Sequence, residues 1–167
     1  MKIIDNFLST NDFQMLKKNV FETYFPWYLS MGVVDGENPN FEPKYNYQMY
    51  HTFYDQPLTV SREFEYLHPI FNILKPSVLI RAKLNLTPNA PKNIEYGYHC
   101  DLTGKLAENA TTAVFYLNTN NGYTKVGDNI VETVENRIVC FPANTPHTGA
   151  TCTDEQFRVA LNLNYID

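Results

Sequence analysis

The chain has 167 residues, of which 44% are hydrophobic and 19% charged, a composition that suits one folded domain with a sizeable core and excludes a disordered protein. The formal charge of −5 disfavours nucleic acid as a partner, because backbone binding needs clustered Lys and Arg. No apolar run approaches the roughly 20 residues of a membrane span, so no membrane partner is expected. Three cysteines without zinc-type pairing, and an opening without signal-sequence character, favour a cytoplasmic protein.

The first 77 residues predict a helical and aromatic support for the rest of the chain. Capping residues at 9–12 precede apolar residues at helical spacing up to position 21, which predicts a helix. Residues 31–43 have the composition of a surface loop, with a mobile lid as the alternative. The tyrosine-rich segment 45–54 predicts a strand that extends the main sheet, and 60–74 predicts a second helix ended by Lys75-Pro76.

From residue 78 onward, about eight short stretches of β-forming residues alternate with Pro, Gly or Asn turns. Asn121-Gly122 is a hairpin signal, and Gly127-Asp128 predicts a second turn. Eight strands make one jelly roll, so the predicted fold is mainly β with flanking helices (α+β): one domain, 1–167, with a cupin-like double-stranded β-helix at 78–167. The strand candidates lie near residues 78–86, 96–100, 111–118, 122–126, 130–134, 137–141, 147–152 and 156–165.

His99 and Asp101 are two residues apart at the end of a predicted strand, so both side chains project from one face and Cys100 points to the other. His147, which follows Pro146, would add a second imidazole from a distant strand. Two histidines and one carboxylate on one face of a metal leave the opposite positions open, which is the arrangement of non-haem Fe(II) oxygenases. The three residues therefore form a candidate metal centre.

Arg158 lies near the start of the strand predicted at 156–165, which has strong alternation. Its own face carries polar or small side chains up to Asn164, while Phe157 and Tyr165 belong to the apolar face. A guanidinium can anchor a carboxylate with two parallel charge-assisted hydrogen bonds, so Arg158 is a candidate for holding the far end of a dicarboxylate that chelates the metal.

With this order of residues, the segment from Val78 to Tyr165 resembles the 2-oxoglutarate- and Fe(II)-dependent dioxygenases. The run 112–122, with its Tyr-Leu-Asn sequence before a glycine, is most similar to the prolyl-hydroxylase-like branch. Small members encoded by phages and marine microbes are also similar, including over 144–149. The resemblance implies Fe(II), 2-oxoglutarate and O2 as cofactors, with ascorbate as an optional accessory, and the host cytoplasm as the location of a viral member.

The resemblance also implies roles for individual residues. His99, Asp101 and His147 would hold iron and form the catalytic centre, and Arg158 would bind the distal carboxylate of 2-oxoglutarate. Tyr116 matches the tyrosine that assists this arginine.

A further cosubstrate contact is expected from the strand at 78–86, where Arg81, Lys83 and Asn85 alternate with apolar residues. Asn85 is the candidate for a cosubstrate ligand, but the pattern leaves open which of the three reaches it.

The implied activity is oxidative decarboxylation of 2-oxoglutarate coupled to hydroxylation of a substrate. A prolyl or other peptidyl side chain is the first expectation for that substrate, and a small molecule or nucleobase is the alternative. Two possibilities of another kind are a non-catalytic, metal-binding jelly-roll module and a structural jelly roll of a capsid or tail.

Overall fold

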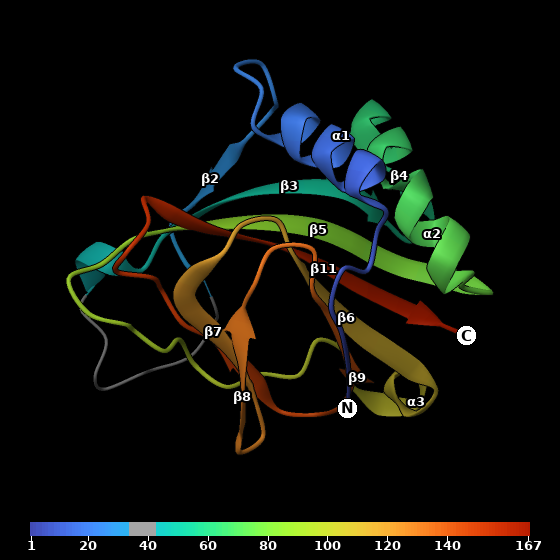
Figure 1. Ribbon diagram of the computed structural model, residues 1–167. Coiled ribbons are helices and arrows are strands. Elements are labelled where there is room, and N and C mark those ends of the chain that lie inside the picture. Colours follow the sequence, from blue (N-terminus) through green and yellow to red (C-terminus); the bar gives the residue numbers. More distant parts are fainter. Residues whose placement is uncertain (34–42) are drawn as a thin grey trace.

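In the computed structural model, which describes residues 1–33 and 43–167, the strands form two antiparallel sheets (Figure 1). The large sheet has eight strands in the order β1-β9-β6-β11-β5-β3-β2, with β4 paired to β3. These strands are β1 (Lys2–Ile4), β2 (Tyr28–Ser30), β3 (Gln48–Asp55), β4 (Leu58–Thr59), β5 (Val78–Pro88), β6 (Ala110–Tyr116), β9 (Ile138–Pro142) and β11 (Phe157–Ile166).

The small sheet has three strands in the order β10-β7-β8, namely β10 (His147–Gly149), β7 (Asn120–Val126) and β8 (Asn129–Thr133). The segment 95–99 extends it, because single antiparallel bridges join Glu95 to Ala150 and His99 to His147. Two facing antiparallel sheets give the double-stranded β-helix that the strand pattern predicted.

The helices are α1 (Thr10–Val20), α2 (His68–Leu74) and α3 (Gly104–Glu108), with 3-10 turns η1 (Pro43–Tyr45) and η2 (Arg62–Leu67). Ser9 caps α1, since its side-chain oxygen accepts a hydrogen bond from the backbone N–H of Asp12. The predicted helix at 60–74 is divided into η2 and α2, and it ends at Lys75, which adopts the left-handed conformation. None of the helices in the two described stretches is long and apolar enough to cross a membrane.

The large sheet is covered on both faces, which explains its alternating residues. Helices α1 and α2 lie over one face, and β7 and β8 lie on the other side (Figure 1). Leu161 and Leu163 of β11 belong to the core on the helix side, while Ala160 belongs to the apolar cluster between the sheets. The polar residues of β11 therefore face the space between the two sheets, as the alternation predicted.

Two local predictions were wrong. Residues 96–100 form no strand, because an isolated bridge at His99 and hydrogen bonds of Tyr96 to Thr148 and Gly149 join them to β10 in place of a continuous ladder. Asn121-Gly122 is not a hairpin turn but part of β7, at a register irregularity between Asn120 and Tyr123. The turn at Gly127-Asp128 is confirmed, with Gly127 at a φ of 55°, whereas positions 34–42 of the predicted loop lie outside the described residues.

Asn136 connects the N-terminal segment to the barrel. It is 7% exposed and has a φ of 59°, and its side chain exchanges two hydrogen bonds of 2.9 Å with the backbone of Leu8. Asn136→Ala should lower the free energy of unfolding by roughly 2–4 kcal/mol, because two buried backbone groups lose their partners and Ala disfavours this φ. Urea denaturation measures the change.

Asn136→Gly serves as the matched control, since Gly tolerates the backbone conformation and loses only the hydrogen bonds. Its destabilisation should be smaller than that of Asn136→Ala. Equal stability of Asn136→Ala and the unmodified protein would show that this link contributes nothing.

Candidate functional site

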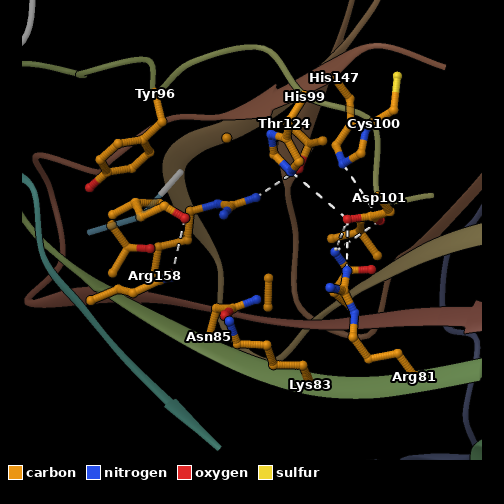
Figure 2. A pocket seen from close by; sticks show the side chains of 17 residues that line it. Arg81, Lys83, Asn85, Tyr96, His99, Cys100, Asp101, Thr124, His147 and Arg158 are labelled. Atoms are coloured by element: carbon orange, nitrogen blue, oxygen red, sulfur yellow. Dashed lines mark hydrogen bonds and ion pairs between the residues drawn. The ribbon is translucent and has the colours of Figure 1, made fainter. Parts of the chain in front are cut away.

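His99 and His147 are brought together by the backbone. The N–H of each donates to the carbonyl of the other, at 3.0 Å and 2.9 Å, in the bridge that joins the segment 95–99 to β10. The two imidazole rings consequently lie side by side, with centroids 4.5 Å apart. Asp101 follows His99 by two residues, and its carboxylate lies next to both rings (Figure 2).

The three side chains form a compact set of metal donors. Nε2 of His99 lies 3.9 Å from Oδ1 of Asp101, and Nε2 of His147 lies 3.7 Å from Oδ2. One ligand atom from each residue lies within 4.8 Å of the others. The Nδ1 atoms face the backbone carbonyls of Gly97 and Thr145, which fixes the proton there and leaves Nε2 of each ring available to a metal.

The Asp101 carboxylate is held by donors from three strands of the large sheet. Arg81 of β5 donates to Oδ1 at 2.8 Å, and Thr112 of β6 donates to Oδ2 at 3.0 Å. From β11, Asn162 and Asn164 donate through their side-chain amides, at 3.2 Å and 3.0 Å to Oδ2. These contacts orient a carboxylate whose side chain is only 3% exposed.

The surroundings of Asp101 and His147 favour the protonation states in which these two residues bind a metal. Burial raises the pKa of Asp101, but Arg81, His147 and Asn164 together outweigh burial, so the pKa is lowered overall. Burial lowers the pKa of His147 despite the nearby Asp101. A carboxylate and neutral imidazoles are the forms that coordinate metals, so the donor set fits Fe(II).

Arg158 is buried, and it is the first residue of β11 whose side chain points into the space between the two sheets. Its Nε donates to Thr133 and its Nη2 to Thr124, both at 2.8 Å, and its guanidinium lies 5.3 Å from the ring centroid of Tyr116. The Tyr116 hydroxyl donates to Thr124 at 2.8 Å, so Tyr116 supports the arginine from behind. Gly122 makes room for it, because a Cβ there would come within 2.8 Å of Arg158 Cδ.

No carboxylate within the described stretches forms an ion pair with Arg158. Burial lowers the pKa of Arg158, although a guanidinium remains charged in proteins. A buried cation without a counter-ion is costly, so an anion bound here gains a strong interaction.

A cavity of about 370 Å³ connects Arg158 with the three metal donors. Arg158 lies on one side and Asp101 on the other, while Asn85 and Lys83 lie between them, across from the histidines (Figure 2). The Oδ1 atom of Asn85 is buried without a hydrogen-bond partner, which is unusual unless a ligand supplies one.

The sequence-predicted residues are thus brought to one place. His99, Asp101, His147, Arg158 and Asn85 all line the cavity. Tyr116 does not line it and lies behind Arg158 instead.

Cys100 is among the residues that line the cavity, and its Sγ points away from Asp101 (Figure 2). Its Sγ donates to the backbone carbonyl of Asn144 at 3.2 Å.

Sequence reasoning did not find the side chains that hold these groups in place. Asn162 and Asn164 carried a signal, since they alternate with Arg158 on one face of their strand. Thr112, Thr124 and Thr133 carried none, because a threonine in a strand is ordinary.

No family model matches the chain, and no curated protein matches its sequence. Solved structures do match its fold. A prolyl hydroxylase from Trichoplax adhaerens, in complex with a hypoxia-inducible-factor peptide fragment, has a TM-score of 0.66 and 15% identity, covering 99% of this chain and 83% of its own. A prolyl-4-hydroxylase from Pseudomonas putida has a TM-score of 0.58 and 14% identity, with coverage of 99% and 90%.

The epimerase SnoN of nogalamycin biosynthesis, a non-haem, α-ketoglutarate-dependent enzyme, has a TM-score of 0.65 and 14% identity, covering 99% of this chain and 76% of its own. At these identities the likeness is one of fold. The chain therefore has the double-stranded β-helix fold that prolyl hydroxylases share with other 2-oxoglutarate-dependent oxygenases.

Proposed function

We propose that this protein is an Fe(II)- and 2-oxoglutarate-dependent oxygenase. The observation that carries the proposal is the single cavity that joins the donors of His99, Asp101 and His147 to the buried, uncompensated guanidinium of Arg158. A metal-chelating dicarboxylate needs these two features at opposite ends of one pocket. The shared fold with oxygenases of this kind supports the same conclusion.

Each residue then has a defined task. His99, Asp101 and His147 hold iron, and Arg158, supported by Tyr116, binds the distal carboxylate of 2-oxoglutarate. Asn85 lies between them along the cavity and contacts the cosubstrate. When bound, iron, 2-oxoglutarate and O2 supply oxidative decarboxylation to succinate and carbon dioxide coupled to hydroxylation of a substrate C–H bond, with ascorbate as an optional accessory.

The structural neighbours support two substrate classes. The Trichoplax enzyme is a prolyl hydroxylase in complex with a peptide, which supports a prolyl or other peptidyl side chain. SnoN was solved in complex with nogalamycin RO, which supports a small molecule. A nucleobase is less favoured because the chain is acidic.

A non-catalytic jelly-roll module is the alternative of another class. Such a module has no use for a buried arginine without a counter-ion at the far end of a metal-donor cavity. The intact donor set together with Arg158 therefore favours an enzyme.

Anaerobic titration of the protein with Fe(II) and 2-oxoglutarate should produce a charge-transfer absorption that requires both components. Admitting O2 should then yield succinate. His147→Ala should lose both signals because it removes one of the three metal donors, whereas His68→Ala, which changes an exposed histidine outside the cavity, should keep them. Absence of the absorption from the unmodified protein would refute the oxygenase assignment.

Arg158→Ala should weaken 2-oxoglutarate binding by roughly ten- to a hundredfold, the scale of a lost charge-assisted hydrogen bond, while Fe(II) still binds. Isothermal titration under anaerobic conditions measures both affinities. Arg62→Ala is the matched control, since that arginine has a side chain 94% exposed on η2. Equal 2-oxoglutarate affinity in Arg158→Ala and Arg62→Ala would exclude the anchoring role.

Gly122→Ala should reduce 2-oxoglutarate affinity about tenfold without removing the metal site, because the new methyl group displaces the Arg158 side chain. Gly32→Ala is the control, as a Cβ there meets nothing within 4 Å. The same calorimetric titration tests the pair. An unchanged affinity in Gly122→Ala would mean that the position of Arg158 does not depend on this close approach.

A further inference from the structure

The inward faces of β5 and β11 form an ordered row of paired residues. Their register sets Arg158 opposite Thr87, Ala160 opposite Asn85, Asn162 opposite Lys83, and Asn164 opposite Arg81. At about 3.3 Å per residue, Asn162 lies roughly 13 Å along the strand from Arg158. A five-carbon dicarboxylate spans only roughly 5–6 Å at about 1.5 Å per carbon–carbon bond. The row therefore extends beyond the cosubstrate.

The far end of this row carries two cations. Arg81 and Lys83 both line the cavity, and Lys83 lies between Asn85 and Arg81 on its floor (Figure 2). Arg81 is paired with Asp101, whereas Lys83 forms no ion pair with any residue in the described parts of the chain. The Lys83 ammonium instead lies 4.8 Å from the ring centroid of Tyr50.

The charge of the cavity stays positive after the proposed centre is assembled. Among the described lining residues Asp101 is the only carboxylate, against the cations Arg81, Lys83 and Arg158. Iron(II) and 2-oxoglutarate carry opposite charges of equal size and leave this balance unchanged. An excess of positive charge therefore remains in the cavity of a chain whose formal charge is −5. Burial, and then the charge of Arg81, lower the pKa of Lys83, so a nearby anion would stabilise its ammonium form.

Two polar atoms beside Lys83 also lack partners. Nε of Arg81 is buried without an acceptor, and Oδ1 of Asn162 is buried without a donor, although the other ends of both side chains are bound to Asp101. Buried polar groups are nearly always hydrogen-bonded, so these atoms are suited to a ligand. Lys83 and Nε of Arg81 offer a cation and a hydrogen-bond donor to an anionic group. Oδ1 of Asn162 offers an acceptor to an N–H or O–H group.

We propose that the primary substrate is a small carboxylic acid that also carries an amine or hydroxyl group, such as a free amino, imino or hydroxy acid. Lys83 and Arg81 bind its carboxylate, and Asn162 accepts its N–H or O–H. The proposal rests on the proposed oxygenase function and selects the small-molecule class over a neutral peptide segment, which would bring no charge to Lys83.

The test uses the full chain loaded with Zn(II), as a diamagnetic substitute for iron, and saturating 2-oxoglutarate. The probes are two matched pairs, L-proline with L-prolinamide and L-lactate with lactamide, together with the neutral peptide analogue N-acetyl-L-prolinamide. The NMR signals of the Lys83 side chain report binding at this position. Both acids should shift these signals saturably, at least tenfold more tightly than their amides.

Lys83→Met should weaken binding of the acids at least tenfold, as followed by calorimetry, whereas Lys83→Arg, which keeps the charge, should retain most of it. Lys18→Met, on the exposed side of α1, is the matched control and should bind like the unmodified protein. Folding of each variant is checked by its backbone NMR spectrum.

Several results would overturn the proposal. These are equal binding of acids and amides, unchanged acid binding in Lys83→Met, or tighter binding of N-acetyl-L-prolinamide, which would indicate a peptide substrate. A tenfold loss of 2-oxoglutarate affinity in Lys83→Met with unchanged proline binding would assign the lysine to the cosubstrate instead. Failure of the proposed oxygenase function itself is seen separately, as failure to bind metal and 2-oxoglutarate before any acid is added.

Discussion

The Asp101 carboxylate is the contact on which the arrangement of the site depends. It follows the segment 95–99 that extends the small sheet, yet its hydrogen-bond donors come from β5, β6 and β11 of the large sheet. A buried carboxylate is tolerated only when such donors replace water. The same contacts that satisfy this charge therefore also join the segment that carries His99 and Asp101 to the large sheet.

The sequence was most informative where one strand has two different faces. Along β11 the alternation correctly separated the core residues from the polar side that includes Arg158, because both faces of a covered strand are constrained by what they contact. His99, Asp101 and His147 could be selected because their residue types and order are unusual. The hairpin prediction at Asn121-Gly122 was wrong because a glycine has more than one use. Gly122 allows the close approach of Arg158 and does not form a turn, and the sequence looks the same in both cases.

What the sequence could not provide are pairings between distant segments. Arg81 precedes Asp101 by 20 positions, and Thr133 precedes Arg158 by 25, and nothing in either neighbourhood indicates these contacts. Irregular backbone is equally hard to foresee. Residues 96–100 have strand composition, but isolated bridges at Glu95 and His99 join this part of the chain to Ala150 and His147 in place of a continuous ladder.

The paired row along β5 and β11 has a consequence for how this protein can change. Residues of a strand that point into the cavity alternate with residues that pack under the helices, so inserting or deleting one residue would exchange the two sets along the rest of that strand. Arg81 and Lys83 would enter the apolar core at the same moment that Ala82 and Leu84 entered the cavity. Substitutions at fixed positions in β5 and β11 can therefore change which ligand binds, whereas insertions and deletions are tolerated only in the connecting loops.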